Sequence, residues 1–142
     1  MNYFIAKIRY EKMQSSGVEK KVTESYLVDA LSFTEAEARI CEEMKPYISG
    51  DFTVHDISRY KVSELFLNEN GDRYYRCKVE FITIDEKSGS EKKQPTYMLA
   101  QASTIDQARD IIVDEMKKTM IDYSIAKIEE TAIMDVFIYG SN

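Results

Sequence analysis

An internal repeat runs through almost the whole chain and constrains the fold more than any other feature. Residues 3–10, YFIAKIRY, match residues 74–81, YYRCKVEF, and a Ser-Gly loop with Glu-Lys-Lys follows each stretch. The copies are offset by about 71 residues, and self-similarity at a fixed offset is the signature of repeated structural units. The sequence therefore predicts two copies of one small unit.

Each copy reads as strand, hairpin, strand, helix and strand. Apolar and polar residues alternate along the first strand, as expected for a sheet with one buried face. The apolar positions are Phe4, Ala6, Ile8 and Tyr10 in one copy and Tyr75, Cys77, Val79 and Phe81 in the other. The Ser-Gly pair supplies the hairpin turn.

Capping boxes mark the two helix starts. Ser32 is followed three positions later by Glu35, and Thr104 by Gln107. Apolar residues then recur at helical spacing in both copies. The third strand of the first copy, residues 51–66, changes its apolar phase near residues 55–57, which predicts a β-bulge there.

These elements predict an α+β fold, a tandem duplication of a ββαβ unit that forms a pseudo-twofold, mostly antiparallel sheet of about six strands with two helices. We expect a single domain over residues 1–142. In it, repeat one (1–67) and repeat two (73–139) are joined by a turn at 68–72 that contains Asn-Gly. The sequence leaves open whether the two units join edge to edge or face to face.

Composition and charge narrow the class of protein. The chain of 142 residues has a net charge of −6, which on average repels nucleic acid and anionic membranes. No segment approaches the roughly 18 consecutive apolar residues of a membrane-spanning helix. The first residues lack the basic and then apolar regions of a signal peptide. We therefore expect an intracellular protein that does not bind membranes.

Two segments, YLVDALSFTEAEARI (residues 26–40) and ETAIMDVF (residues 130–137), resemble an uncharacterised domain-of-unknown-function family from gut Bacteroides-type bacteria and their phages. The resemblance covers nearly the whole chain, and YLVDA with the following helix start is its most specific part. It implies the cytoplasm of a bacterial or phage-infected cell, and it brings no activity and no catalytic residues. A phage or mobile-element setting favours DNA transactions or interference with a host factor, by association only.

No constellation of residues points to catalysis, a cofactor or a metal. His55 is the only histidine, and its counterpart in the second copy is Ala126. Cys41 and Cys77 stand at positions that are apolar in the other copy, so we expect both to pack in the core. Acidic pairs recur on both helices and fit a solvated helix face better than a cation site. We expect a non-enzymatic protein without a cofactor.

The remaining candidate is the face of each first strand opposite its apolar side. A tyrosine followed by alternate basic residues appears there in both copies, and hairpin lysines extend both faces. Rings that stack on bases and cations that contact phosphates are how many sheets hold single-stranded nucleic acid. The predicted nucleic-acid-binding residues are Tyr3, Lys7, Arg9, Lys20, Lys21, Tyr74, Arg76, Lys78, Lys92 and Lys93.

Two alternative functions stay open. One is a protein-interaction module, an adaptor or an inhibitor of a host factor, that uses its acidic helices to meet a basic partner. The other is a small-ligand site where the repeats meet, with Tyr26, Tyr97 and Asp29 as candidates. The sequence does not distinguish a monomer from a homodimer.

Overall fold

A computed structural model describes residues 2–140 of the chain, which divide into two compact units. Within the described residues, unit 1 comprises 2–60 and 132–140, and unit 2 comprises 61–131. The elements, in chain order, are β1 (Asn2–Met13), β2 (Glu19–Ala30), α1 (Phe33–Met44), β3 (Phe52–Arg59), β4 (Glu64–Phe66), β5 (Arg73–Ile84), β6 (Glu91–Ala102), α2 (Ile105–Lys117), β7 (Tyr123–Glu130) and β8 (Ile133–Phe137).

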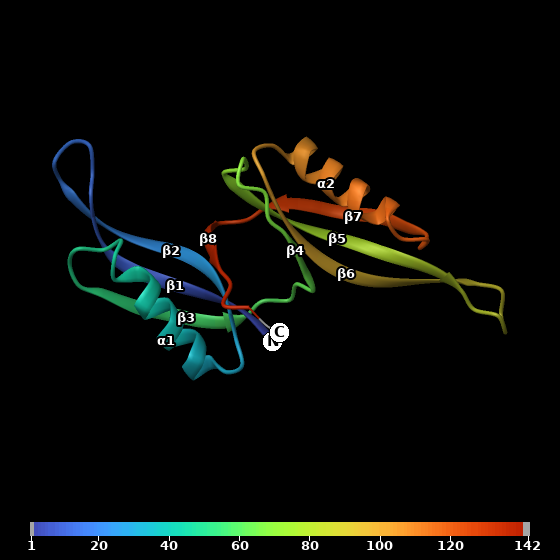
Figure 1. Ribbon diagram of the computed structural model, residues 1–142, viewed down its shortest axis with the longest axis horizontal. Coiled ribbons are helices and arrows are strands. Elements are labelled where there is room, and N and C mark those ends of the chain that lie inside the picture. The colour runs from blue at the N-terminus through green and yellow to red at the C-terminus, as the bar shows by residue number, and fades with distance from the viewer. Residues whose placement is uncertain (1, 141–142) are drawn as a thin grey trace. The chain divides into compact units, whose positions relative to one another are not determined.

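Unit 1 is a four-stranded sheet with one face covered by α1 (Figure 1). The strand order is β3-β1-β2-β8, and all pairings are antiparallel except the parallel pairing of β2 with β8. The alternating residues of β1 and the apolar stripe of α1 form the core between sheet and helix. Its largest fully buried side chains include Phe4, Ile8, Val28, Ile40 and Met44.

Unit 2 has the same design. Its strand order is β4-β6-β5-β7, with a parallel pairing of β4 with β6 and antiparallel pairings elsewhere, and α2 covers one face (Figure 1). The core between this sheet and α2 contains Cys77, Val79, Met98, Ile112 and Met116. Two similar units of sheet and helix confirm the predicted α+β class and the internal duplication.

The number of strands and sheets differs from the sequence-based expectation, because the predicted third strand, residues 51–66, divides into β3 and β4. The β1–β3 ladder ends at the pair Phe4 and Arg59, and the amide of Tyr60 donates to the Tyr3 carbonyl close to the start of β1. β4 pairs instead with β6 in unit 2, and β8 pairs with β2 in unit 1, so each repeat contributes its last strand to the other repeat's sheet.

The predicted β-bulge is confirmed and lies at His55. Val54 pairs with Ile8 and Asp56 with Lys7, so His55 is the extra residue on β3. The bulge lets Val54 and Ile57 both pack against the core beneath α1. Ala126 on β7 is the equivalent extra residue in unit 2.

The predicted helix starts and hairpin turns are also confirmed. Ser32 Oγ accepts from the Glu35 amide at 3.1 Å, and Glu35 Oε1 accepts from the Leu31 amide at 2.9 Å. Thr104 and Gln107 make the same pair of bonds at the start of α2. Gly17 and Gly89 in the two hairpin loops have φ values of 86° and 71°, which favour glycine because it lacks a Cβ.

Candidate anion-binding site

The strand registers place the predicted basic residues on the outer face of each sheet, which we define as the face opposite the helix. Lys7 and Arg9 lie on the outer face of unit 1, and Arg76 and Lys78 on that of unit 2. The two tyrosines are less accessible than the sequence pattern indicates. Tyr3 is half-buried and Tyr74 is only 6% exposed, so the Tyr74 ring offers little surface to a base.

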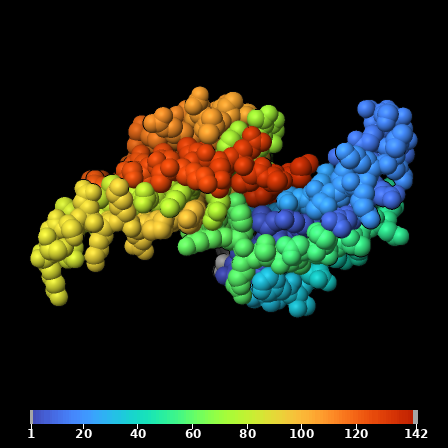
Figure 2. Space-filling model, turned by 180° about the vertical axis from the view of Figure 1, so that it is seen from behind, coloured from blue at the N-terminus to red at the C-terminus, as the bar shows by residue number. Residues whose placement is uncertain are grey.

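The hairpin lysines are all exposed, and the β5–β6 hairpin that carries one pair extends well past α2 (Figures 1 and 2). Each pair divides between the two faces of its sheet. Lys21 pairs with Glu11 and Lys93 with Ile82, which puts both lysines on the outer faces. Lys20 and Lys92 lie on the other side, and Lys92 forms an ion pair with Asp85 at 3.8 Å.

On the outer face of unit 1, local partners engage the predicted cations. Arg9 donates through Nε to Thr23 Oγ1 at 3.2 Å, and its Nη2 lies 3.1 Å from His55 Nε2. Lys7 is the direct cross-strand partner of Asp56. Arg9 is therefore engaged by neutral side chains, and Lys7 has a carboxylate directly opposite it.

On the outer face of unit 2, neighbouring strands gather cations around one tyrosine. A cavity of about 180 Å³ is lined by Arg76, Lys78, Tyr97, Lys127 and Glu129, which we call the basic pocket. The Arg76 guanidinium lies 4.1 Å from the centre of the Tyr97 ring, and its Nε and Nη2 both donate to the Lys61 carbonyl. The Lys61 ammonium lies 5.3 Å from the same ring. Arg76 is thus a fixed positive charge at the pocket wall.

Lys78 and Lys127 are direct cross-strand partners in this pocket. Like charges in that position destabilise a sheet. Lys127 is compensated by Glu129, whose Oε2 lies 3.1 Å from its ammonium. Among residues 2–140, Lys78 forms no ion pair. The pocket therefore has more positive charge than its own carboxylate balances.

Sequence reasoning named Tyr97 only for a small-ligand site and did not name Lys127, so neither residue was in the predicted nucleic-acid-binding set, for two separate reasons. It matched Tyr97 with Tyr26, whereas the strand registers match Tyr26 with Met98 and Tyr97 with Ser25. Tyr26 lies on the helix side of unit 1, stacked 5.8 Å from Phe137, and Tyr97 lies on the outer face of unit 2. Lys127 follows the bulge at Ala126, which turns its side chain to the outer face.

The cysteines and helix acids considered for thiol chemistry or metal binding are packed or paired within the fold. Burial raises the pKa of the Cys77 thiol to about 11, and Cys41 is half-buried rather than fully enclosed. No group of three or more His, Cys, Asp or Glu side chains that would hold a metal exists among the described residues. Lysines one turn away pair with several helix acids: Glu42 with Lys45, Asp114 with Lys117 and Glu115 with Lys118.

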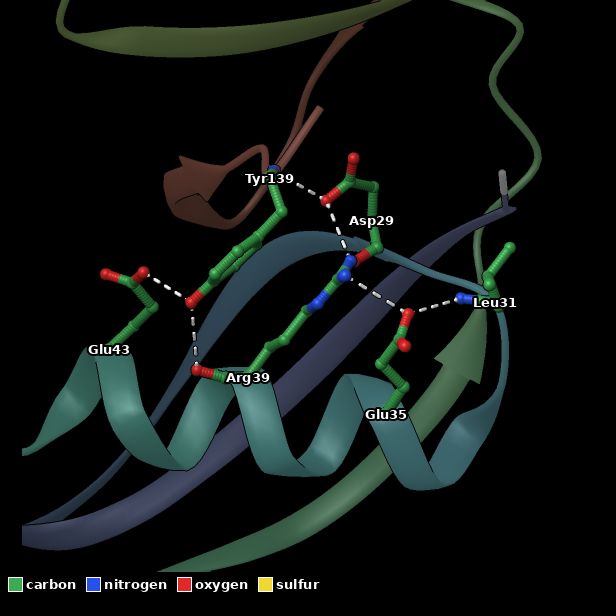
Figure 3. Close-up of polar contacts among 6 residues, drawn as sticks. All are labelled: Asp29, Leu31, Glu35, Arg39, Glu43 and Tyr139. Atoms are coloured by element: carbon green, nitrogen blue, oxygen red, sulfur yellow. Dashed lines mark hydrogen bonds and ion pairs between the residues drawn. The ribbon is translucent and has the colours of Figure 1, made fainter. Parts of the chain in front are cut away.

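Asp29 belongs to a polar cluster that fastens the segment after β8 (Figure 3). Its Oδ1 accepts from the Tyr139 amide at 2.8 Å and lies 3.5 Å from Arg39 Nη1, and the Arg39 guanidinium lies 4.5 Å from the Tyr139 ring centre. In unit 2, Gln101 accepts in the same way from the Asn68 amide, just after β4. Because both units use this position to hold the end of the parallel strand, we assign Asp29 a structural role.

A second cluster, unique to unit 1 among the residues described, joins Glu24 to two tyrosines. Tyr10 donates to Glu24 at 2.7 Å and Tyr26 at 3.1 Å, and Lys12 pairs with the same carboxylate at 3.3 Å. Burial works to raise the pKa of Glu24, but the hydrogen bonds from both tyrosines outweigh it and lower that pKa. Burial and Glu24 raise the pKa of Tyr10 to about 12.

Fold and site together define an α+β protein of two related sheet-and-helix units with a basic pocket on one of them. The chain belongs to the family described as Domain of unknown function (DUF4494), whose model matches residues 2–139. Comparison with curated proteins and with solved structures gave no match. Among the described residues, no helix is long and apolar enough to cross a membrane.

Proposed function

We propose that the protein is a non-enzymatic binding module and that the outer face of unit 2 holds single-stranded nucleic acid. The observation that carries this proposal is the gathering of Arg76, Lys78 and Lys127 around Tyr97. Lys and Arg contacts to phosphates supply most of the affinity of sequence-independent nucleic-acid binding. The resemblance to a family of gut bacteria and their phages adds phage or mobile-element DNA transactions as the proposed setting.

The layout of the face suits an unpaired strand. Unpaired bases stack on aromatic rings and on Arg guanidinium planes, and Arg76 lies over Tyr97 in such an arrangement. Lys93 on β6 lies on the same face. Its cross-strand partner, Ile82, is four residues from Lys78 along β5. That separation is about 14 Å at ~3.4 Å per residue. Glu80 lies between Lys78 and Ile82 on this face, so the cations gather mainly at the basic pocket, and such a local cluster attracts an anion even though the chain as a whole is acidic.

The test is fluorescence anisotropy with a labelled single-stranded oligonucleotide at two or more salt concentrations. We expect saturable binding at low salt and a steep decline as salt rises. The double variant Lys78→Gln/Lys127→Gln should bind more weakly. The slope of log affinity against log salt should become shallower by about 0.7 for each phosphate that the variant no longer neutralises.

The matched control is Lys117→Gln/Lys118→Gln, which removes the same charge from the end of α2 in the same unit. Those lysines pair with Asp114 and Glu115, away from the basic pocket. The control should bind as the unaltered protein does. Absence of binding at low salt, or equal weakening in both double variants, overturns the proposal.

A further inference from the structure

The size of the basic pocket limits what it holds. Its volume is about 180 Å³. Pockets for drug-sized ligands begin at about 300 Å³. The basic pocket is therefore a small site, and a compact anionic group of a few heavy atoms suits it.

The charge of the basic pocket defines the group further. Three cations and one carboxylate line it, a surplus of two positive charges, and Glu129 is already engaged with Lys127. A phosphodiester within a nucleic-acid strand carries one negative charge. A terminal phosphate monoester carries about −1.5 to −2 near pH 7 and has three strong acceptor oxygens. The monoester is the better match in charge.

The positions of the cations favour the same ligand. Arg76 is fixed by Tyr97 and by the Lys61 carbonyl, so its conformational freedom is already restricted before an anion arrives. Lys78 and Lys127 face each other across two strands, and an anion that binds both relieves their repulsion. Each ammonium has three donors to offer.

From this geometry we propose that the basic pocket binds one terminal phosphate group, the phosphorylated end of a nucleic-acid strand. The inference rests on the function proposed above and specifies which part of the strand the pocket takes. It also predicts one such site per chain. The equivalent positions in unit 1 are Ile5, Lys7, Ser25, Asp56 and Ser58, with one cation and one carboxylate and therefore no surplus charge.

The experiment compares internally labelled oligonucleotides of one sequence that end in a 5′-phosphate, a 3′-phosphate or two hydroxyls. We expect one phosphorylated form to bind about tenfold tighter than the hydroxyl form, the size of effect given by a charge-assisted hydrogen bond. Lys78→Gln should remove this difference and leave residual binding to all three. Glu129→Gln should strengthen binding of the phosphorylated form, because it removes the negative charge that lines the pocket. Circular dichroism verifies that each variant is folded.

The possible outcomes separate the two proposals. Equal affinity for all three oligonucleotides, still weakened in the Lys78→Gln/Lys127→Gln variant, overturns the terminal-phosphate inference and leaves nucleic-acid binding intact. Absence of binding by any oligonucleotide overturns both. An NMR titration with inorganic phosphate distinguishes the source of the group. Saturable shifts at Lys78 and Tyr97 without oligonucleotide binding overturn the assignment to a nucleic-acid end and indicate a free phosphate ligand.

Discussion

Lys78 on β5 and Lys127 on β7 are direct cross-strand partners on the outer face of unit 2, and within residues 2–140 only Lys127 of the two forms an ion pair. A sheet selected for stability alone would place opposite charges at such a pair. The pairing of two lysines therefore lowers the stability of the sheet, and the proposed binding of an anion explains why lysines occupy both positions.

Replacement of Lys78 should separate stability from binding. Lys78→Glu places a carboxylate opposite Lys127, so we expect the free energy of unfolding to rise by about 0.2–1 kcal/mol. Affinity for oligonucleotide should fall in the same variant. Urea denaturation and anisotropy measure the two effects. Lower stability together with unchanged binding would contradict the assignment of Lys78 to the site.

Asp29 should control the attachment of the segment after β8. Asp29→Ala removes the acceptor of the Tyr139 amide and the partner of Arg39, and we expect the free energy of unfolding to fall by about 1–3 kcal/mol. Hydrogen exchange at the Tyr139 amide should accelerate. Asp29→Asn keeps an acceptor oxygen and should preserve much of that protection. Unchanged exchange in the alanine variant would show that this bond does not hold the segment.

Gly71 should tolerate no side chain. A Cβ at this position meets backbone atoms of Ala102 at 2.5 Å, an approach that requires the backbone of β6 to shift. Gly71→Ala should lower the free energy of unfolding by about 1–3 kcal/mol or more. Gly50→Ala is the control, since a Cβ there has nothing within 4 Å. Urea denaturation compares the two variants, and equal midpoints would contradict the close approach.

The Glu24 cluster should give unit 1 a component of stability that depends on pH. The pKa of Glu24 is lowered in the folded state, so its contribution is present above the ordinary value of 4.5 and is lost as pH falls through the folded pKa. Glu24→Gln should cost about 1–3 kcal/mol at neutral pH, and the difference from the unaltered protein should shrink at acid pH. Urea denaturation across this range measures it. Glu11→Gln, at an exposed position on the same hairpin, should show no such trend.

The two cysteines should differ in reactivity. Cys77 is fully buried and its pKa is raised to about 11, whereas Cys41 is half-buried on α1. A thiol reagent should therefore modify Cys41 first and reach Cys77 only when unit 2 opens. Mass spectrometry of the native protein follows both rates, and Cys77→Ala identifies the slow one. Equal rates under native conditions would contradict the burial of Cys77.

Much of the fold follows from local sequence patterns. Three local patterns each identify an element or its boundary without reference to the rest of the chain. They are the alternation of apolar and polar residues in β1 and β5, the capping boxes at Ser32 and Thr104, and the change of apolar phase at His55. The strand with which β4 pairs does not follow from such a local pattern. Nothing within residues 64–66 distinguishes pairing with β2 from pairing with β6, because the choice depends on residues far away in sequence.

The candidate site was only partly predictable for a related reason. The alternation in β5 identified Arg76 and Lys78, whose side chains follow directly from the pleat of one strand. Tyr97 and Lys127 reach the same pocket through the register of two neighbouring strands, and a shift of one residue in register moves a side chain to the opposite face. The internal repeat suggested two equivalent faces, yet the changes from Asp56 to Lys127 and from Ile5 to Arg76 give only unit 2 the surplus of positive charge.

The exchange of last strands between the repeats sets an order of events during synthesis. All of unit 2 lies within residues 61–131, whereas β2 pairs with β8 through pairs such as Ser25 with Ile133. Ribosomes deliver the N-terminal residues first, and domains usually fold in that order. In this chain unit 1 begins first, but its last strand, β8, is translated only after all of unit 2. Until residues 133–137 have been translated, β2 has an open edge on the nascent chain, at which neighbouring chains on the same messenger RNA compete with β8.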